Sequence, residues 1–182
     1  FAHLDAPLPA VVEELAAAPE PLVYLGLGSS ASRALVLRTA RALGDLPVNV
    51  VAPVRHYLRD DDVLPPNVHV TDLLPAHRLG GLVGAAVLHG GQGTVQTACA
   101  TGVPFVGMGL QPEQTWNVRR CEERGNAVVV SPRRVGTQDF RTGVHRALFD
   151  PAVRAAAAEV REASAGEDGA AATARVIERG LA

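Results

Sequence analysis

The sequence predicts an α/β fold with about six parallel strands in a doubly wound sheet and helices on both of its faces. Short apolar runs rich in β-branched residues recur without polar alternation, as expected for strands that are buried on both faces. Helical stretches separate these runs, and the connections are short, which favours right-handed crossovers between parallel strands. In such sheets, ligands bind at the carboxyl ends of the strands.

Six segments are expected to form strands because they are rich in Val, Leu and Ala. They are residues 22–27, 48–52, 68–71, 85–88, 104–107 and 127–130. Three of the intervening helices are expected to end at a glycine in the left-handed conformation. These helices cover residues 32–43, 93–101 and 115–124, and the glycines that follow them are Gly44, Gly102 and Gly125.

The two ends of the chain differ from its centre. Residues 1–20 are punctuated by proline, and we expect them to be a connector from a missing amino-terminal domain. Residues 21–182 are expected to form the domain itself. Its tail, 137–182, is helical by composition, with a break at Pro151 and a glycine-containing interruption at 165–169. The last amphipathic helix is expected to pack outside the sheet.

Composition argues against several classes of protein. The 182 residues are 47% hydrophobic and 20% charged, which suits one compact core. A net charge of −2 and scattered arginines argue against nucleic acid as a partner. The longest apolar stretch, 79–88, is short and contains three glycines, so no membrane span is expected. Cys99 and Cys121 form no paired metal-ligand spacing, and we expect inert thiols in a reducing cytoplasm.

Two glycine-rich segments lie between a predicted strand and a predicted helix, where backbone N–H groups and the helix dipole favour phosphate. The first runs from Gly26 to Ala31 and fits the dinucleotide pattern G-x-G-x-x-G/A. That pattern needs an acidic residue at the end of the second strand, but residues 52–55 are Ala-Pro-Val-Arg. A nicotinamide cofactor is therefore not favoured, and a plain tight turn before a helix is the alternative.

The second segment begins where a predicted strand ends at His89, and it continues through Gly90, Gly91 and Gly93 to Thr94 at the start of a helix. Glycines let a diphosphate approach the backbone, and the helix amides point at it. The His89 ring can donate a hydrogen bond to an oxygen. Such a loop stabilises a leaving diphosphate without a metal. Taken alone, however, a glycine-rich loop is more often a simple turn.

Four motifs occur in order along residues 21–125. They are Val23-Tyr24-Leu25-Gly26-Leu27-Gly28-Ser29, Asp72-Leu73-Leu74-Pro75-Ala76-His77, His89-Gly90-Gly91-Gln92-Gly93-Thr94, and Pro112-Glu113-Gln114-Thr115-Trp116-Asn117. Together they resemble the donor-site signature of inverting, UDP-glycosyltransferase-like enzymes of bacterial natural-product type. The resemblance implies the GT-B architecture of two facing Rossmann-like domains. This chain would be the carboxyl-terminal domain, which binds the nucleotide sugar.

The resemblance also implies a role for each motif. The diphosphate would be bound by groups from both glycine loops, namely Ser29, His89, Gly91, Gly93 and Thr94. The base would pack on the segment after the third strand, Pro75, Ala76 and His77, with the Ala76 backbone pairing with a pyrimidine edge.

The sugar of the donor would be bound by Glu113 and Gln114, although relatives more often carry Asp at the first of these positions. Trp116 and Asn117 follow on the same helix and are at least as compatible with packing as with ligand contact. Many relatives carry a ribose-binding Glu where this chain has Thr97. Because Thr cannot take two hydroxyls as a carboxylate can, this change is compatible with a dTDP-sugar donor. Alternatively, Thr97 only faces the helix interior.

Inverting transfer needs a base on the acceptor hydroxyl and stabilisation of the departing diphosphate. In the resembled family the base is a His, oriented by an Asp, in the amino-terminal acceptor domain, so this chain alone is expected to be inactive. The proposed reaction moves a sugar from a dTDP- or UDP-sugar to a small-molecule hydroxyl. The alternatives are a separate donor-binding subunit of a two-polypeptide transferase, or a nucleotide-binding Rossmann-like domain outside the transferases.

No metal or other cofactor is expected. Asp60-Asp61-Asp62 has the D-x-D spacing of metal-dependent transferases. The triplet follows Arg59 in a polar segment away from the glycine loop, which favours a solvated run of charges.

Overall fold

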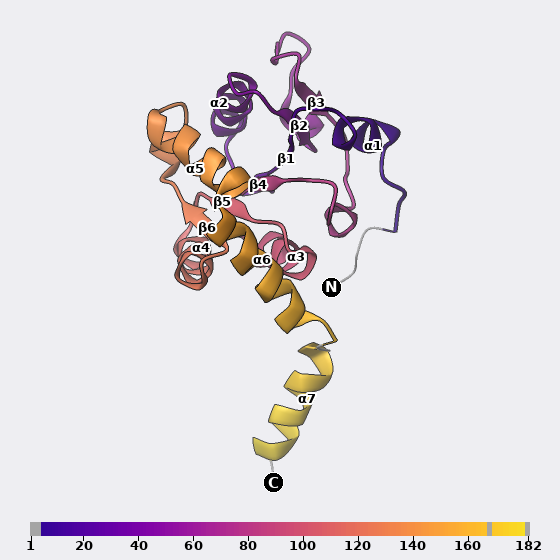
Figure 1. The fold of residues 1–182 in the computed structure, drawn as a ribbon, viewed down its shortest axis with the longest axis vertical. Coiled ribbons are helices and arrows are strands. Elements are labelled where there is room, and N and C mark those ends of the chain that lie inside the picture. The colour runs from indigo at the N-terminus through magenta and orange to yellow at the C-terminus, as the bar shows by residue number, and fades with distance from the viewer. Residues whose placement is uncertain (1–4, 167–168, 181–182) are drawn as a thin grey trace.

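The computed structural model describes residues 5–166 and 169–180. Six strands form one parallel sheet in the order β3-β2-β1-β4-β5-β6 (Figure 1), which confirms the predicted fold class. Each predicted strand is present, with at most one residue fewer at an end. The strands are β1 Leu22–Gly26, β2 Asn49–Ala52, β3 Val68–Val70, β4 Ala85–Leu88, β5 Phe105–Gly107 and β6 Ala127–Val129.

The strand order reverses between β1 and β4. The chain first builds outward from β1 through β2 to β3 and then returns to place β4 on the other side of β1. The last residues of the two central strands, Gly26 and Leu88, are partners in the sheet register. Two connections therefore diverge at the carboxyl ends of β1 and β4, which is the crevice where doubly wound sheets bind ligands.

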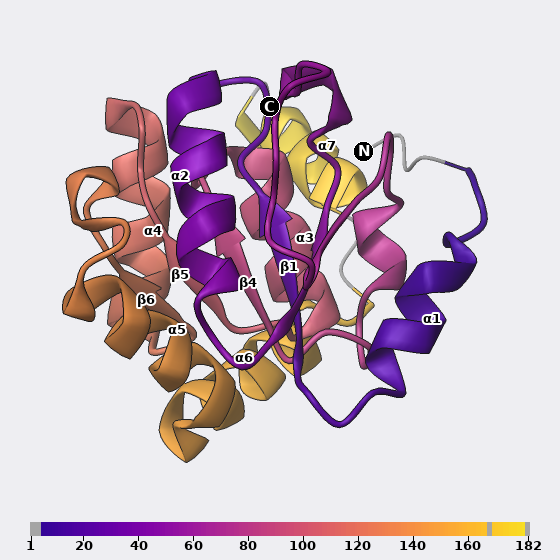
Figure 2. The same cartoon turned by 90° about the horizontal axis from the view of Figure 1, so that it is seen from above.

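Helices cover both faces of the sheet (Figure 2). One apolar layer contains α2 and α5, and the other contains α1, α3 and α4. Within a strand, successive residues face opposite layers: Val50 lies in the first and Val51 in the second. The helices are α1 Ala10–Ala16, α2 Arg33–Gly44, α3 Gln92–Thr101, α4 Pro112–Arg124, α5 Gln138–Phe149, α6 Pro151–Ser164 and α7 Gly169–Gly180.

Two of the three predicted glycine caps are confirmed. Gly102 and Gly125 end α3 and α4 in the left-handed conformation, with φ of 68° and 91°. The prediction for Gly44 is wrong, because this residue is the last of α2, and the right-handed Asp45 follows it as the cap. Gly44 has a packing reason instead: a Cβ there would lie 2.3 Å from Cγ of Pro65.

The segment expected to be a connector contributes to the core over its described part. Helix α1 buries Val12 and Leu15 in the same apolar layer as α3 and α4. Short 3-10 helices follow three of the strands. They are η1 Arg55–Tyr57, η2 Ala76–Arg78 and η3 Pro132–Arg134.

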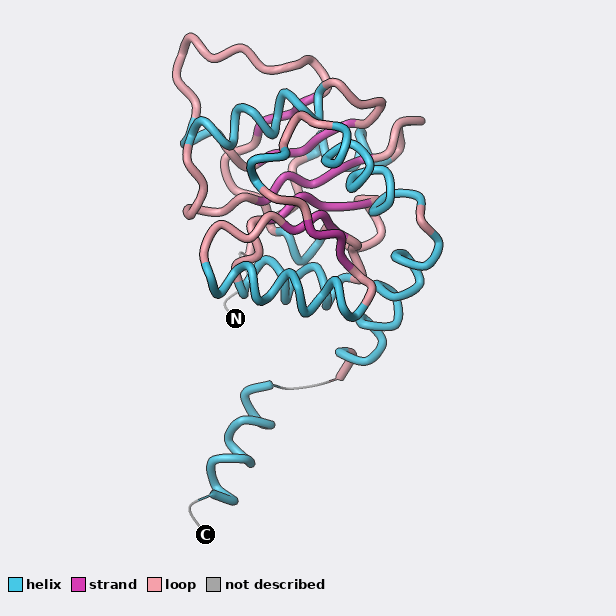
Figure 3. The backbone as a smooth tube through the Cα atoms, turned by 90° about the vertical axis from the view of Figure 1, so that its left-hand side faces the viewer, coloured by secondary structure: helices cyan, strands magenta, loops and turns pink. Residues whose placement is uncertain are grey.

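The carboxyl-terminal tail is helical as predicted, and α5 gives way to α6 at Pro151. Helix α6 packs on α3 and α5 through Val153 and Ala157. The prediction that the last helix packs outside the sheet is wrong, because α7 extends away from the body (Figures 1 and 3) and buries none of its residues 169–180. Its apolar Val176 and Ile177 are exposed. Within the described ranges, no helix has the length and apolarity that a membrane span requires.

Candidate functional site

Three loops and one helix end meet at the carboxyl ends of β1 and β4. The turn after β1 lies against His89, which directly follows β4. The amino end of α4 contacts the turn after β1 through Gln114, which is bonded to Ser30, and the glycine loop after β4 through Asn117, which is bonded to Gly90. The segment around η2 faces α3 across a pocket. The tertiary structure therefore gathers all four motifs that the sequence placed in separate connections.

The His89 ring is buried, with 7% of the residue exposed. Its Nδ1 atom lies 3.2 Å from the carbonyl oxygen of Gly26 at the end of the neighbouring strand. A carbonyl only accepts hydrogen bonds, so Nδ1 carries the proton and donates it. The neutral ring then has a lone pair on Nε2, and only the protonated ring has an N–H there. His89 can therefore donate to a ligand oxygen through Nε2 only as the imidazolium.

Glycines surround this ring closely. A Cβ on Gly28, whose φ is +56°, would lie 2.6 Å from Cε1 of His89, and a Cβ on Gly91 would lie 2.3 Å from Nε2. Gly90, with φ of +85°, is similarly close to α4, because its Cβ would lie 2.6 Å from the Gln114 carbonyl oxygen. At these positions, the absence of a side chain makes room for the imidazole and for α4.

Helix α3 begins in the glycine loop without a side-chain cap, so no side chain occupies its first backbone N–H groups. These groups and the helix dipole favour an anion. The Thr94 hydroxyl donates to the Gly91 carbonyl oxygen at 2.9 Å, so in this conformation it can only accept from a ligand. In this conformation the Thr94 backbone N–H is the group placed to donate to a phosphate oxygen, while the role of its hydroxyl in diphosphate binding stays a prediction.

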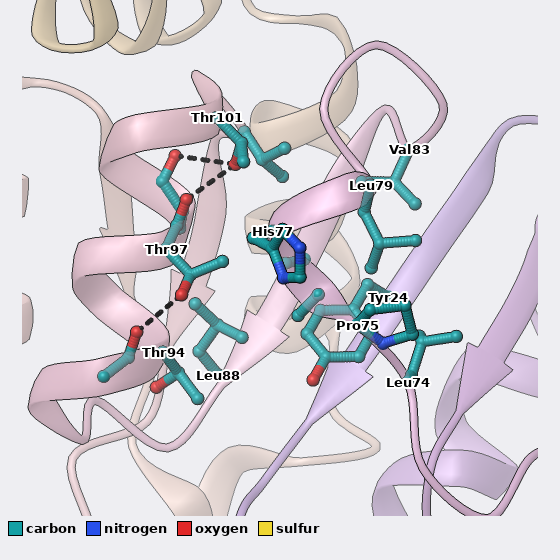
Figure 4. A pocket seen from close by; sticks show the side chains of 15 residues that line it. Tyr24, Leu74, Pro75, His77, Leu79, Val83, Leu88, Thr94, Thr97 and Thr101 are labelled. Atoms are coloured by element: carbon teal, nitrogen blue, oxygen red, sulfur yellow. Dashed lines mark hydrogen bonds between the residues drawn. The ribbon is translucent and has the colours of Figure 1, made fainter. Parts of the chain in front are cut away.

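A pocket of about 270 Å³ lies between α3 and the segment around η2 (Figure 4). Thr94, Thr97 and Thr101 form its wall on α3, and Pro75 and His77 lie opposite. Ala76 also lines this pocket. The predicted base-binding and ribose-side residues are thus brought together. The remaining lining is mostly apolar: Tyr24, Leu74, Leu79, Val83, Ala86, Leu88, Gly93, Ala98 and Val103.

The hydroxyl of Thr97 donates a hydrogen bond within its own helix. Its Oγ1 donates to the Gly93 carbonyl oxygen at 2.8 Å, and Thr101 makes the equivalent bond to Thr97 at 2.7 Å. Thr97 therefore offers a ligand an oxygen lone pair and a methyl group but no donated proton.

Tyr24 lines the same pocket, and sequence reasoning missed it. Its ring covers Gly26, where a Cβ would lie 2.7 Å from Cε1 of Tyr24. Burial raises the pKa of Tyr24 to about 12, so the phenol is neutral at physiological pH. A signal was present in the sequence, because residues two apart on a strand share a face. Tyr24 stands two positions before the Gly26 that begins the glycine loop.

The predicted sugar-binding pair divides into two different roles. Glu113 is exposed at the start of α4. Gln114 is only 3% exposed, and its amide is already bonded at both ends. It accepts from the Leu110 backbone N–H at 3.1 Å and donates to the Ser30 hydroxyl at 3.0 Å. Gln114 thus holds α4 to the turn after β1, with Ser30 rather than Ser29 as the bonded residue of that turn.

Asn117 connects the carboxylate to the glycine loop. Its Nδ2 donates to the Gly90 carbonyl oxygen at 3.0 Å and to Oε1 of Glu113 at 2.5 Å. The side chain left open between packing and ligand contact therefore orients the Glu113 carboxylate. Trp116 is exposed, with the Arg120 guanidinium 5.8 Å from the centre of its ring.

The acidic triplet is only in part a solvated run of charges. Asp60 and Asp61 are exposed, as predicted. The prediction is wrong for Asp62, whose side chain is 7% exposed, forms an ion pair with Arg33 of α2 and accepts from the Arg59 backbone N–H at 2.7 Å. Across residues 5–166 and 169–180, no group of three or more His, Cys, Asp or Glu side chains is placed to hold a metal.

Comparison with protein families places this geometry in a known class. Residues 37–178 match the model of the family described as erythromycin biosynthesis protein CIII-like, C-terminal domain. The chain belongs to this family. The CIII-like match confirms the resemblance to natural-product glycosyltransferases seen in the four motifs.

Curated relatives of the CIII-like domain are named glycosyltransferases. A PGL/p-HBAD biosynthesis glycosyltransferase of Mycobacterium tuberculosis is 32% identical over 145 residues, which are 79% of this chain and 33% of the relative. The 4'-demethylrebeccamycin synthase of Lentzea aerocolonigenes is 35% identical over 150 residues, 81% of this chain and 35% of the relative. The chain thus spans about a third of the length of these relatives.

The solved structure of the glycosyltransferase VinC in complex with DTDP is also similar. It is 28% identical with a TM-score of 0.72, and the match covers 86% of this chain and 40% of VinC. The CIII-like domain is therefore one Rossmann-like half of a GT-B fold, as the sequence predicted.

Proposed function

We propose that this chain is the donor-binding half of an inverting glycosyltransferase that uses a pyrimidine diphosphate sugar and a small-molecule hydroxyl acceptor. The observation that carries this proposal is the pocket between α3 and η2, which joins the base-binding segment to the glycine loop at the point where the strand order reverses. The relatives are named glycosyltransferases, and VinC was solved with DTDP. Both facts support a nucleotide sugar as the ligand.

The base is proposed to lie on Pro75 and Ala76. The Ala76 carbonyl oxygen already accepts from the Leu79 backbone N–H at 3.1 Å. A pyrimidine edge can therefore pair with the Ala76 N–H and with the second lone pair of its carbonyl. Because backbone groups make this contact, it distinguishes pyrimidine from purine without any particular side chain.

The diphosphate is proposed to lie at the amino end of α3, with Ser29 reaching it from the facing turn. The free N–H groups of the first helical turn, the helix dipole and a protonated His89 all favour an anion there. In the transfer, the acceptor oxygen bonds to the anomeric carbon as the bond to the diphosphate breaks. The proton of the acceptor passes to a base on the other half of the enzyme, and the α3 end stabilises the departing charge without a metal.

A deoxyribose and thymine fit the pocket better than a ribose and uracil. Thr97 Oγ1 donates to Gly93 and can accept from one sugar hydroxyl, but it cannot hold two hydroxyls as a carboxylate can, and a second hydroxyl buried without a partner would cost roughly 1–3 kcal/mol. A thymine methyl gains apolar contact in a pocket lined by Leu79 and Val83. Both effects favour a dTDP-sugar as donor.

Side-by-side calorimetric titration of dTDP and UDP into this chain tests the assignment. We expect dTDP to bind at least as tightly as UDP, and we expect no transfer of sugar to an acceptor by this chain alone. A clear preference for UDP would overturn the thymidine assignment. Transfer by the isolated chain would overturn the proposed division of roles between two halves, and failure of both nucleotides to bind would refute the donor site.

A further inference from the structure

The turn after β1 is held on two sides by other connections. The hydroxyl of Tyr57, in η1, donates to the Gly28 carbonyl oxygen. The side-chain amide of Gln114, in α4, donates to the Ser30 hydroxyl at 3.0 Å. Ser29 lies between these two tethered residues and is exposed. Among the residues that the structure describes, neither the N–H nor the hydroxyl of Ser29 donates to a protein group. Ser29 therefore presents two donors on a turn whose neighbouring residues are fixed.

Gly28 gives this turn conformational freedom. Its φ is +56°, in the left-handed region that glycine enters without strain. Rotation of the peptide between Gly28 and Ser29 would exchange the direction of its carbonyl with that of its N–H, because the two groups point opposite ways across a planar trans peptide. One orientation presents the Ser29 N–H to an anion. The other presents a carbonyl oxygen, which cannot donate to an anion.

Tyr57 is itself held in place from several directions. Its ring packs against the apolar layer that contains α2, and the centre of the ring lies 4.3 Å from the centre of the His56 ring. Helix η1 is joined to the end of β3, because the Arg55 backbone N–H donates to the Thr71 carbonyl oxygen at 3.4 Å and Nε of Arg55 lies 3.1 Å from Oδ1 of Asp72. The Tyr57 hydroxyl therefore reaches Gly28 from a supported position and selects one orientation of its carbonyl.

We infer that Tyr57 is a positioning residue for the diphosphate: by holding the Gly28 carbonyl oxygen, it keeps the Ser29 N–H directed at the phosphate oxygens. The inference rests on the proposed function, because it concerns the diphosphate of the same donor site. Gly28 also lies against the ring of His89, where a Cβ would come within 2.6 Å of Cε1, so the turn and His89 act on neighbouring parts of the ligand. Tyr57 does not contact the ligand in this role, since its hydroxyl proton is donated to Gly28.

Calorimetric titration of thymidine and dTDP into the wild-type chain and into Tyr57→Phe tests this role. The phenylalanine keeps the ring that packs on the apolar layer and removes only the hydroxyl. The variant should bind dTDP roughly three- to tenfold more weakly, because the turn loses the hydrogen bond that selects its orientation. Thymidine should bind both chains equally. Val63→Thr, a neutral change at an exposed position of the same connection, is the matched control and should alter neither affinity.

Amide NMR spectra of the isotope-labelled chain provide a readout that a purely structural role would not move. At saturation, dTDP but not thymidine should shift the Ser29 amide resonance of the wild-type chain, and the shift should be smaller in Tyr57→Phe. The role of Tyr57 is refuted if wild-type binding of dTDP leaves that amide unmoved. It is also refuted if Tyr57→Phe binds dTDP as tightly as the wild-type chain, or loses thymidine and dTDP binding equally. Failure of the wild-type chain to bind dTDP at all would instead refute the donor site on which this role depends.

Discussion

At the scale of single residues, hydrogen-bond partners decide what each side chain can offer a ligand. His89 has its Nδ1 proton fixed by Gly26, so its chemistry toward a ligand depends on Nε2. Gln114 is bonded at both ends, whereas its neighbour Glu113 is exposed and oriented by Asn117. The same motif thus contains a group that holds the protein together and a group that can contact a sugar.

Replacing His89 by Ala should weaken binding of dTDP by about tenfold or more and leave binding of thymidine nearly unchanged. The reason is that a hydrogen bond to a charged group contributes roughly 1.5–3 kcal/mol, and only the diphosphate receives it. Calorimetry with both ligands measures the difference. Equal losses for both ligands would show that His89 only supports the loop.

Replacing Asn117 by Leu should weaken binding of a dTDP-sugar more than binding of dTDP. The change removes the donor that orients the Glu113 carboxylate, and a hydrogen bond of about 0.5–1.5 kcal/mol corresponds to a loss of roughly two- to tenfold. The ratio of the two dissociation constants is the measurement, because general damage to the fold would lower both affinities together. Arg119→Gln, at an exposed position of the same helix, is the matched control and should leave the ratio unchanged.

At the scale of elements, long-range contacts hold the connections around the sheet in place. Gly44 allows Pro65 to approach the end of α2, and the Arg33–Asp62 ion pair joins the start of α2 to the same connection between η1 and β3. Asn67 adds hydrogen bonds to the carbonyl oxygens of Leu46 and Val48. Helix α2 therefore positions the long polar segment between η1 and β3. The sequence of that segment alone suggested that it was solvated.

Asp62→Asn should lower the melting temperature at neutral pH, and Asp61→Asn should have little effect. The hydrogen bond from the Arg59 N–H, with the Arg33 ion pair, holds the pKa of Asp62 below its usual range. A carboxylate with a lowered folded-state pKa stabilises the fold above its unfolded pKa, and this stabilisation is lost as the pH falls through the folded value. Melting curves from pH 7 down to pH 3 should therefore show the wild-type and Asp62→Asn values converging in acid. A constant difference would contradict the electrostatic explanation.

At the scale of the whole molecule, the chain divides into a packed body and a projecting helix. The body has apolar layers on both faces of the sheet, closed on one side by α6, whereas α7 buries none of its residues 169–180 (Figure 3). Stability should therefore depend on α6 and not on α7.

Removal of residues 167–182 should leave the melting temperature within about 1 °C of the full chain, because no buried apolar area is lost from the described part of α7. Val153→Ala on α6 is the contrasting variant, since Val153 is buried against the core. Its loss should reduce the free energy of unfolding by about 2 kcal/mol. Differential scanning calorimetry compares the three proteins. A large loss on truncation would show that α7 packs on the body in solution.

Local patterns in the sequence determined the six strands, the glycine loops and the order of the four motifs. These features depend on burial and backbone conformation at neighbouring positions, which periodicity and glycine placement report directly. Two of three glycine caps followed for the same reason. The predicted cap at Gly44 was wrong. A side chain is excluded at this position because Pro65, from a later connection, lies too close for a Cβ.

Only the tertiary structure decided which groups face a ligand and which face the protein. The hydrogen-bond partner of His89, the bonded state of Gln114 and the place of Tyr24 in the pocket all depend on contacts between separate connections. Such contacts form when the sheet closes and carry no local periodicity. The sequence alone therefore predicted where the candidate site lies, and the fold decided how its atoms are arranged.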